Sequence, residues 1–581
     1  MKYTLNFDRT AEKRIGVHIE THSPGGPVRF HLPLWRPGRY TRQEYARNVA
    51  DVVARGGGGQ PLPLTKVAAN TWEVAAPAGP VSLSYTYFAD QLDAGGVYLD
   101  DAHIYVNGIC LFMYREELID EACELLLELP ETYRLAGISG EPGDALHLAS
   151  FHELVDSPFF AGEQLIHHAF EQEGIAFHIW FMGECMPDLP RMEADFRRYT
   201  AAQLALFGDF PVNEYHYLVI MRPAHYRHGV EHQRSTVISI GPGYELMQPG
   251  FYRSFLEICS HELFHTWNVK ALRPVDMFPY RYGEPNYSRL HYVTEGITTY
   301  YGDLMIWKGG GWSLDQWLQS LNGELRAHHQ MGGKDFTSLE AASFDSWVNG
   351  YGAEGAPNRR ISFYTKGYLV SFLLDFFIRK ASGNRASLDD VLYRMYHEIA
   401  KAGRAYTKLD YKTFIEAESG ADASDFFEKY ISGTEPLEPL LAEAAAYFGF
   451  QLDRVRPDSL AESLLGIKTQ VNGSVTGIEN LLPGSPALLA GLSKGDELLS
   501  VESLRIDRNL EELLYYFRER SELHIHYFRL NRLHETRVRP GTGFSPFLPR
   551  FVQLASPSEA QLANRQAWQT VHAAARISEK R

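Results

Sequence analysis

The sequence predicts a multidomain α+β protein, because strand-forming and helix-forming segments occupy separate parts of the chain. Short alternating runs divided by turns fill residues 1–165, whereas longer helical patterns dominate residues 166–450. Strands return in residues 451–545, and residues 546–581 are polar and alanine-rich. This order is typical of α+β proteins and differs from the regular alternation of βαβ units. We therefore expect four regions with these boundaries.

The first region is predicted to be an all-β domain, specifically a β-sandwich. Apolar and polar residues alternate in runs such as Lys2–Phe7 and Val81–Phe88. Glycine-rich and proline-rich clusters at 23–27 and 55–61 provide turns between such runs. The segment LWRPGRY at 34–40 is interpreted as a further turn with a structural role.

The second region opens with two strands, and helices follow. Helical periodicity is predicted for Phe251–Val269 and for Val293–Trp307. Capping boxes that begin at Ser313 and Ser387 mark the starts of two later helices. The third region is a compact β-rich module. In the fourth region, Ser558–Ala575 is expected to form a helix.

Composition excludes some classes of function. Hydrophobic residues make up 45% and charged residues 22% of the 581 residues, as in soluble globular proteins. The formal net charge of −16 offers no basic surplus to neutralise nucleic-acid phosphates. The four cysteines (Cys110, Cys123, Cys185 and Cys259) are too widely spaced for a disulfide framework or a structural zinc site.

No targeting or membrane segment is evident in the sequence. The first twenty residues have no apolar core, so they do not resemble a signal peptide, and no run of 18 apolar residues exists. We therefore expect a cytoplasmic protein without membrane association. A chain trimmed of a signal peptide would look the same and would be periplasmic.

One predicted helix carries a metal-binding pattern, His261-Glu262-Leu263-Phe264-His265. Histidines four residues apart lie on one helix face, so both imidazoles can reach one metal ion, and Glu262 lies beside a water bound to it. Catalytic zinc needs a third protein ligand and one open position. Glu295 lies 30 residues after His265 in the next predicted helix, and we favour it as that ligand over a surface role. One Zn²⁺ per chain is expected.

The motif and its surroundings resemble a known family. His261-Glu262-x-x-His265-Thr-Trp-Asn-Val-Lys270, followed by Glu295-Gly296-x-Thr298-x-Tyr300-Tyr301, is similar to the gluzincin metallopeptidases. Among these, the resemblance is greatest to the glycyl aminopeptidase family with a C-terminal PDZ domain, and it covers nearly the whole chain. It implies a thermolysin-like, mostly helical catalytic domain at 166–450. His291 and Phe363 depart from the family pattern at positions expected in the pocket walls.

The same resemblance implies roles for residues outside the motif. Tyr364, in Tyr-x-Lys-Gly, would stabilise the oxyanion; Tyr368, one helical turn further on, is the alternative. Glu231, in the segment that begins at Gly229, would hold the free amino group of the substrate. In the third region, Leu465-Gly466-Ile467 would form the carboxylate-binding loop of a PDZ groove, which is either open to a peptide C-terminus or closed by neighbouring structure.

The resulting functional hypothesis is a zinc aminopeptidase that removes small N-terminal residues, Gly or Ala, from peptides. The preference for small residues comes from the resemblance alone. Within the mechanism, Glu262 takes a proton from the attacking water and passes it to the leaving amine. Two alternatives stay open, namely a zinc endopeptidase that uses the PDZ module to present chain ends and a non-catalytic peptide-binding protein.

Overall fold

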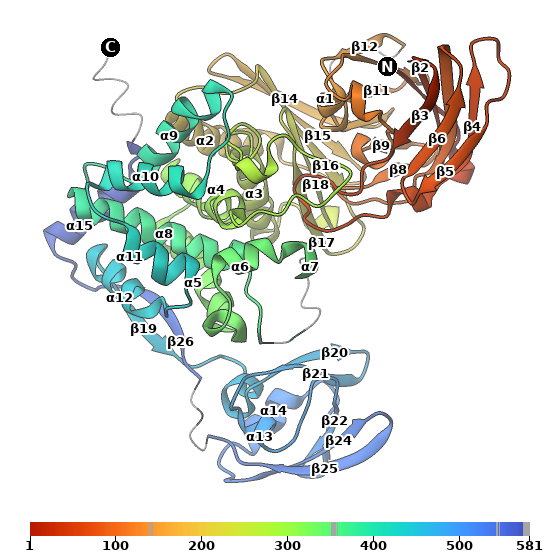
Figure 1. Ribbon diagram of the computed structural model, residues 1–581. Coiled ribbons are helices and arrows are strands. Elements are labelled where there is room, and N and C mark those ends of the chain that lie inside the picture. The colour runs from red at the N-terminus through yellow and green to blue at the C-terminus, as the bar shows by residue number, and fades with distance from the viewer. Residues whose placement is uncertain are drawn as a thin grey trace.

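The computed structural model describes residues 1–138, 140, 143–349, 356, 358–541, 544 and 546–572. It is a multidomain α+β protein with a β-rich N-terminal part and a helical catalytic region, as the sequence predicts (Figure 1). A smaller β-rich module lies apart from the helices, below them in the view of Figure 1. No helix among the described residues combines the length and apolar character needed to cross a membrane.

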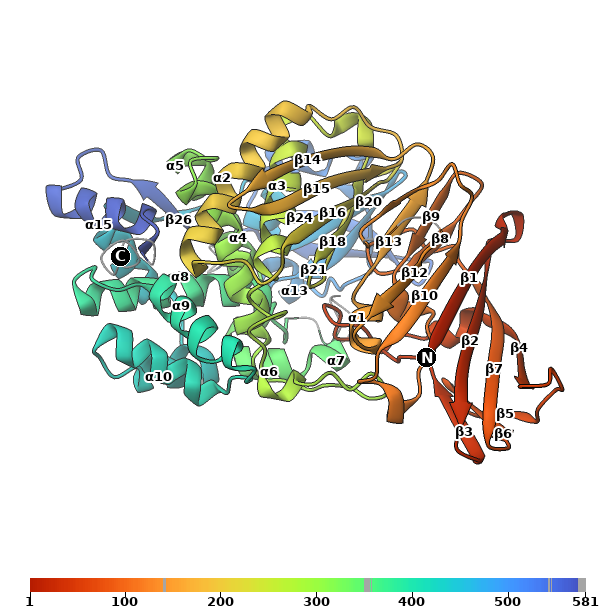
Figure 2. The ribbon, with the colours of Figure 1, turned by 90° about the horizontal axis from the view of Figure 1, so that it is seen from above.

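The N-terminal part contains three sheets (Figure 2). The largest has the order β12-β10-β1-β2-β7-β4, and its strand β1 (Lys2–Arg9) buries every second side chain, as the alternating pattern predicts. A three-stranded sheet has the order β3-β6-β5. The four-stranded sheet β11-β13-β9-β8 goes beyond the predicted sandwich. The other strands are β2 (Arg14–Ser23), β3 (Gly26–His31), β4 (Val49–Gly56), β5 (Leu64–Ala68), β6 (Thr71–Ala76), β7 (Gly79–Phe88), β8 (Val97–Leu99), β9 (His103–Val106), β10 (Cys123–Glu128), β11 (Arg134–Ala136), β12 (Ala145–Leu148) and β13 (Phe159–Gly162).

The catalytic region is built on a five-stranded sheet of order β14-β15-β16-β18-β17. Its strands are β14 (Ile166–Gln172), β15 (Ile175–Met182), β16 (Glu214–Met221), β17 (Tyr226–Glu231) and β18 (Ser235–Gly241). Trp180, Leu218 and Val237 on one sheet face share a buried cluster with Tyr105 and Phe160 of the N-terminal part. This apolar contact joins the two regions, so residues of the N-terminal part can reach the catalytic region.

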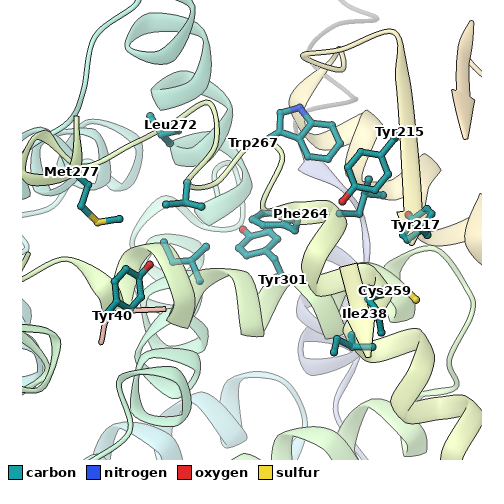
Figure 3. Packing of buried hydrophobic residues seen from close by; sticks show 14 of the residues in the cluster. Tyr40, Tyr215, Tyr217, Ile238, Cys259, Phe264, Trp267, Leu272, Met277 and Tyr301 are labelled. Carbon is teal, nitrogen blue, oxygen red and sulfur yellow. The ribbon is translucent and has the colours of Figure 1, made fainter. Parts of the chain in front are cut away.

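Helices make up most of the rest of the catalytic region. They include α2 (Leu189–Phe207), α3 (Pro249–Phe264), α4 (Ile297–Lys308), α5 (Leu314–His329), α8 (Phe363–Ser382) and α9 (Leu388–Glu398). Two of them carry motif residues: α3 carries His261 and Glu262, and α8 carries Tyr364. The rings of Phe264 on α3 and Tyr301 on α4 stack with centroids 5.0 Å apart, and Figure 3 shows them in the core between the helices. The capping boxes predicted at Ser313 and Ser387 are present.

Two helix boundaries differ from the prediction. Helix α3 ends at Phe264, and His265 is its C-cap, although the apolar pattern continues to Val269. The chain turns there because the Asn268 side chain donates to the Val293 and Thr294 carbonyls, at 2.9 and 3.2 Å. The second predicted helix begins as a π-helical turn, Tyr292–Gly296, before α4. Such turns occur often at functional sites.

The C-terminal module is inserted through a two-stranded ribbon. Strand β19 (Phe450–Val455) pairs antiparallel with β26 (Leu548–Gln553), and Val455 is the register partner of Leu548. Between them lie the sheet strands β20 (Ile467–Asn472), β21 (Val475–Leu481), β22 (Glu497–Val501), β23 (Leu504–Arg505), β24 (Leu523–Arg529) and β25 (Arg532–Val538), with helices α13 (Pro486–Leu489) and α14 (Leu510–Tyr516). These elements enclose a hydrophobic cluster of their own.

The last described segment packs onto the catalytic helices. The predicted tail helix is shorter than Ser558–Ala575 and spans Glu559–Gln569 (α15); residues 573–575 lie outside the described residues. Trp568 is fully buried, its ring stacks on Phe448, and its indole N–H donates to the Tyr300 hydroxyl at 3.0 Å. This segment is therefore part of the catalytic core, whereas the sequence predicted a polar tail.

Candidate active site

Two histidines at the end of α3 point their Nε2 atoms at the same space. His261 Nε2 lies 3.0 Å from His265 Nε2. On the other side of the His265 ring, Nδ1 lies 2.9 Å from the Asn268 carbonyl, so Nδ1 carries the proton that it donates there. The Nε2 lone pair of His265 is then free to coordinate a metal ion.

The π-helical turn delivers Glu295 to the same space. Its Oε2 lies 3.4 Å from His265 Nε2 and 3.9 Å from His261 Nε2. Its other oxygen, Oε1, accepts a hydrogen bond of 3.0 Å from the hydroxyl of Tyr40. Tyr40 belongs to the LWRPGRY segment, and its ring packs on His291 with centroids 3.7 Å apart. The N-terminal part thus orients one member of the triad.

The triad fits a metal ion. Two imidazole nitrogens and a carboxylate oxygen lie within 4.8 Å of one another. Tetrahedral ligands about 2.0–2.1 Å from a zinc ion lie roughly 3.3 Å apart, and the separations in the triad range from 3.0 to 3.9 Å. This donor set of two histidines and one carboxylate is that of a catalytic site with an open position.

Electrostatics in the triad favour a bound cation. Burial and the neighbouring His265 hold the pKa of His261 well below its usual value. Burial alone would lower the pKa of His265, but the Glu295 carboxylate raises it to about 10. The carboxylate next to the His265 imidazole therefore favours a positive charge at this centre.

Glu262 lies beside the triad and is buried. Burial raises its pKa to about 8, and the nearby Glu231 and Glu295 carboxylates contribute to the rise. Its Oε2 has no hydrogen-bond partner within the described part of the chain. Strand β17 runs close against it, because a methyl group at Gly229 would collide with the Glu262 carboxylate. Gly229 therefore leaves room for Glu262 to face the cavity.

Glu231 ends β17 and faces the same centre. Its carboxylate lies within 4.8 Å of ligand atoms of Glu262 and His265. It is 4% exposed, and its Oε1 makes no hydrogen bond to any described residue. The turn of the N-terminal part also closes on it, since a side chain at Gly38, which has a φ of +75°, would collide with this carboxylate. A buried carboxylate with one oxygen free of hydrogen bonds suits a cationic ligand group.

An ion pair between Asp156 and the buried Lys270 holds the strand that carries Glu231. Asp156 accepts hydrogen bonds from Lys270 Nζ at 2.6 Å and from the Gln233 backbone N–H at 2.9 Å. Its Oδ1 also lies 3.2 Å from His232 Nδ1, next to Glu231. These contacts tie the end of β17 to the segment that follows His265.

One cavity of about 700 Å³ brings the residues together. The predicted residues that line it are Gly229, Glu231, His261, Glu262, His265, Glu295 and Tyr364. Tyr368 is not among its lining residues; it is fully buried and packs edge-on against Tyr300. Helix α8 comes close enough to present Tyr364 because Gly367 contacts Gly296 backbone to backbone.

The predicted carboxylate-binding loop lies in the separate module, outside this cavity. Leu465 and Ile467 are buried, and Gly466 has a φ of +69° and packs against Ser485 and Phe544. Ile467 begins β20, which is an edge strand of its sheet.

Sequence reasoning missed Tyr40 and Asp156. LWRPGRY was interpreted as a structural turn, yet its tyrosine contacts Glu295 directly. The arginine-flanked aromatic residue after Pro-Gly was the available signal. The sequence around Asp156 contains no comparable signal, because an isolated acidic residue after a short helix is common on protein surfaces.

Comparisons with solved structures agree with this fold. In solved structures, an aminopeptidase N family protein from Idiomarina loihiensis is similar with a TM-score of 0.90 and 24% identity, covering 98% of this chain and 100% of that chain. A mutant of an M1 zinc metallopeptidase from Deinococcus radiodurans, bound to a Tyr-Ser-Ala substrate, has a TM-score of 0.48 and 14% identity, covering 76% of this chain and 94% of that chain. No curated protein matches the sequence.

The sequence also matches two family descriptions. Residues 2–163 match the Peptidase M61 N-terminal domain, and residues 254–370 match M61 glycyl aminopeptidase. The second match contains the whole metal triad, Glu262 and Tyr364. Through these N-terminal and catalytic regions, the chain is identified as a member of the M61 glycyl aminopeptidase family of peptidases.

Proposed function

We propose that this protein is a zinc-dependent aminopeptidase that hydrolyses the N-terminal peptide bond of peptides. The proposal depends mainly on the buried Glu231 carboxylate, which lies beside the His261–His265–Glu295 triad in one cavity and whose Oε1 has no hydrogen-bond partner among the described residues. The triad would hold one zinc ion, which when bound supplies Lewis acidity for a water molecule and for the scissile carbonyl. The family supports a further preference for small residues, Gly or Ala.

Each step of the proposed hydrolysis is assigned to particular residues of this chain. Glu262 takes the proton of the attacking water and returns it to the leaving amine, a role that its raised pKa suits. Glu231 pairs with the substrate ammonium and thereby sets the register at one residue per cycle. The Tyr364 hydroxyl donates to the oxygen that becomes negative in the tetrahedral intermediate. Tyr40 and Asn268 orient Glu295 and His265.

We also propose that residues 451–545 form a PDZ-like module. It follows the catalytic domain at 166–450, and from residue 546 the chain returns to the catalytic helices. Its support is the six-stranded sheet with the edge strand β20, because an edge strand can pair with an added peptide strand. The loop Leu465-Gly466-Ile467 would receive a peptide carboxylate next to Phe544.

Cleavage of matched peptides with free and acetylated N-termini tests the main proposal. The aminopeptidase releases one residue at a time from the free peptide and leaves the acetylated peptide intact. Equal cleavage of both peptides would favour the endopeptidase alternative. Absence of cleavage together with absence of bound zinc would favour a non-catalytic peptide-binding protein.

A further inference from the structure

A second group of acids lines the catalytic cavity away from Glu231. Glu257 comes from α3, Asp303 from α4 and Glu324 from α5. Glu257 precedes His261 by one helical turn, roughly 6 Å along the axis, whereas Glu231 lies beside His265 at the other end of the motif. Along α3, the His261–His265 pair therefore lies between Glu231 and Glu257, and Asp303 and Glu324 lie near Glu257.

Basic side chains balance the three acids only in part. Glu257 Oε1 pairs with Arg253 Nε at 3.1 Å. Asp303 is 9% exposed and accepts a hydrogen bond from the Ser320 hydroxyl. Glu324 Oε2 and the buried Tyr368 hydroxyl beside it have no partner among the residues that the structure describes. Burial raises the pKa of Asp303 and of Glu324, and the Glu257 carboxylate adds to both rises. Arg227 lines the same cavity from β17, so Arg227 and Arg253 together offset two of the three charges and leave one carboxylate without a basic partner in the described part of the chain.

The spacing of these acids suits a large cation. Across the described residues, the groups whose ligand atoms lie within 4.8 Å of one another do not include these three carboxylates together. A metal ion with ligands about 2.0–2.6 Å away needs that closeness. A guanidinium or ammonium group on a flexible side chain bridges a wider gap, and arginine pairs with carboxylates through several hydrogen bonds.

We propose that Glu257, Asp303 and Glu324 form a subsite for the cationic side chain of the residue that follows the scissile bond. This inference rests on the proposed function, because Glu231 and the triad set the direction of the peptide. With the ammonium at Glu231 and the first carbonyl at the triad, the second residue extends toward the acids. The preferred substrates are therefore peptides with Arg or Lys in the second position.

Three otherwise identical peptides beginning Gly-Arg, Gly-citrulline and Gly-Glu test the subsite, since citrulline keeps the shape of arginine without its charge. The wild-type protein should show kcat/KM at least tenfold higher for Gly-Arg than for Gly-citrulline, and lowest for Gly-Glu. Glu324→Gln and Glu257→Gln should each reduce the Arg/citrulline ratio at least threefold. Glu479→Gln, an exposed change on β21, is the matched control and should keep the ratio.

Binding to an inactive protein gives a second measurement. In the Glu262→Gln background, titration calorimetry should give tighter binding of Gly-Arg than of Gly-citrulline peptide, and added Glu324→Gln should remove the difference. Equal cleavage and equal binding of the three peptides would overturn the subsite while leaving the aminopeptidase intact. A second equivalent of bound metal that disappears in Glu324→Gln would also overturn it. Failure to cleave any of the three peptides would instead contradict the proposed function.

Discussion

The hydroxyl of Tyr40 donates to Glu295 Oε1 across 255 positions of sequence, at 3.0 Å. The donor lies in the turn of the β-rich N-terminal part, and the acceptor is the carboxylate of the proposed metal triad. A hydrogen bond of this kind fixes the orientation of a ligating carboxylate and leaves its other oxygen directed at the metal. The active site is therefore assembled from two regions of the chain.

Tyr40→Phe is expected to weaken zinc binding by about 10–100-fold, the usual effect of losing a partner of a metal ligand. The ring would keep its packing on His291, so stability should change little. Competition with a chromogenic chelator measures the zinc affinity. Tyr45→Phe is the matched control, since that buried hydroxyl has no partner within the described chain. Equal zinc affinity in both variants would contradict the role of Tyr40.

Glu262→Gln should abolish most turnover while the protein keeps its zinc. The amide has nearly the same shape but cannot accept the proton of the attacking water, and general-base catalysis contributes roughly 10²–10⁴-fold. Zinc content and kcat measured on one preparation separate the two effects. Turnover near the wild-type rate would refute the general-base assignment.

Glu231→Gln should lower kcat/KM for peptides with a free N-terminus. Loss of a hydrogen bond to a charged group costs about 1.5–3 kcal/mol, which the rate should reflect. Acetylated peptides, which lack the ammonium, are the control and should stay uncleaved by either protein. A variant that processes free peptides at the wild-type rate would exclude Glu231 as the amine-binding residue.

Zinc removal should lower both activity and thermal stability. Ligand binding to the folded state stabilises it by about 2.7 kcal/mol when free ligand is 100-fold above Kd. A chelator should therefore reduce Tm, and added zinc should restore it. His265→Ala removes one proposed ligand, so its Tm should not respond to zinc; a response of wild-type size would contradict the ligand assignment.

Deletion of the C-terminal module should leave cleavage of short reporter substrates intact. Val455 and Leu548 are paired across the ribbon, so an Asn-Gly turn can replace residues 456–547 and close a hairpin. The residues that line the catalytic cavity all lie outside the deletion. Aminoacyl reporter assays on the folded variant provide the measurement, and loss of reporter cleavage would assign the module a role in the site itself.

The metal triad was accessible from sequence because its geometry is local. Two histidines four residues apart on a helix must share a face, and Glu295 follows within the next helical segment. The change from strands to helices along the chain likewise predicted the α+β class and the β-rich N-terminal part. Each of these predictions depends on residue patterns that are short in sequence and repeat within single helices or strands.

The contacts that form only in the tertiary structure could not be predicted from the sequence. The apolar pattern of α3 continues to Val269, but the bonds of Asn268 to the π-helical turn end the helix at Phe264. Strand β26 was assigned to a polar tail because its partner β19 precedes the inserted module. Tyr40 reaches Glu295 only once the β-rich part has docked on the catalytic sheet.

Trp568 has a consequence for the order in which the chain can fold during synthesis. Its buried indole contacts Tyr300, five residues after Glu295, and fills space between catalytic helices. A nascent chain that has not yet extended past the inserted module lacks this side chain. We expect its catalytic helices to remain incompletely packed and its hydrolytic centre to remain unformed. The late arrival of Trp568 would thus keep a peptidase inactive while it is still attached to the ribosome.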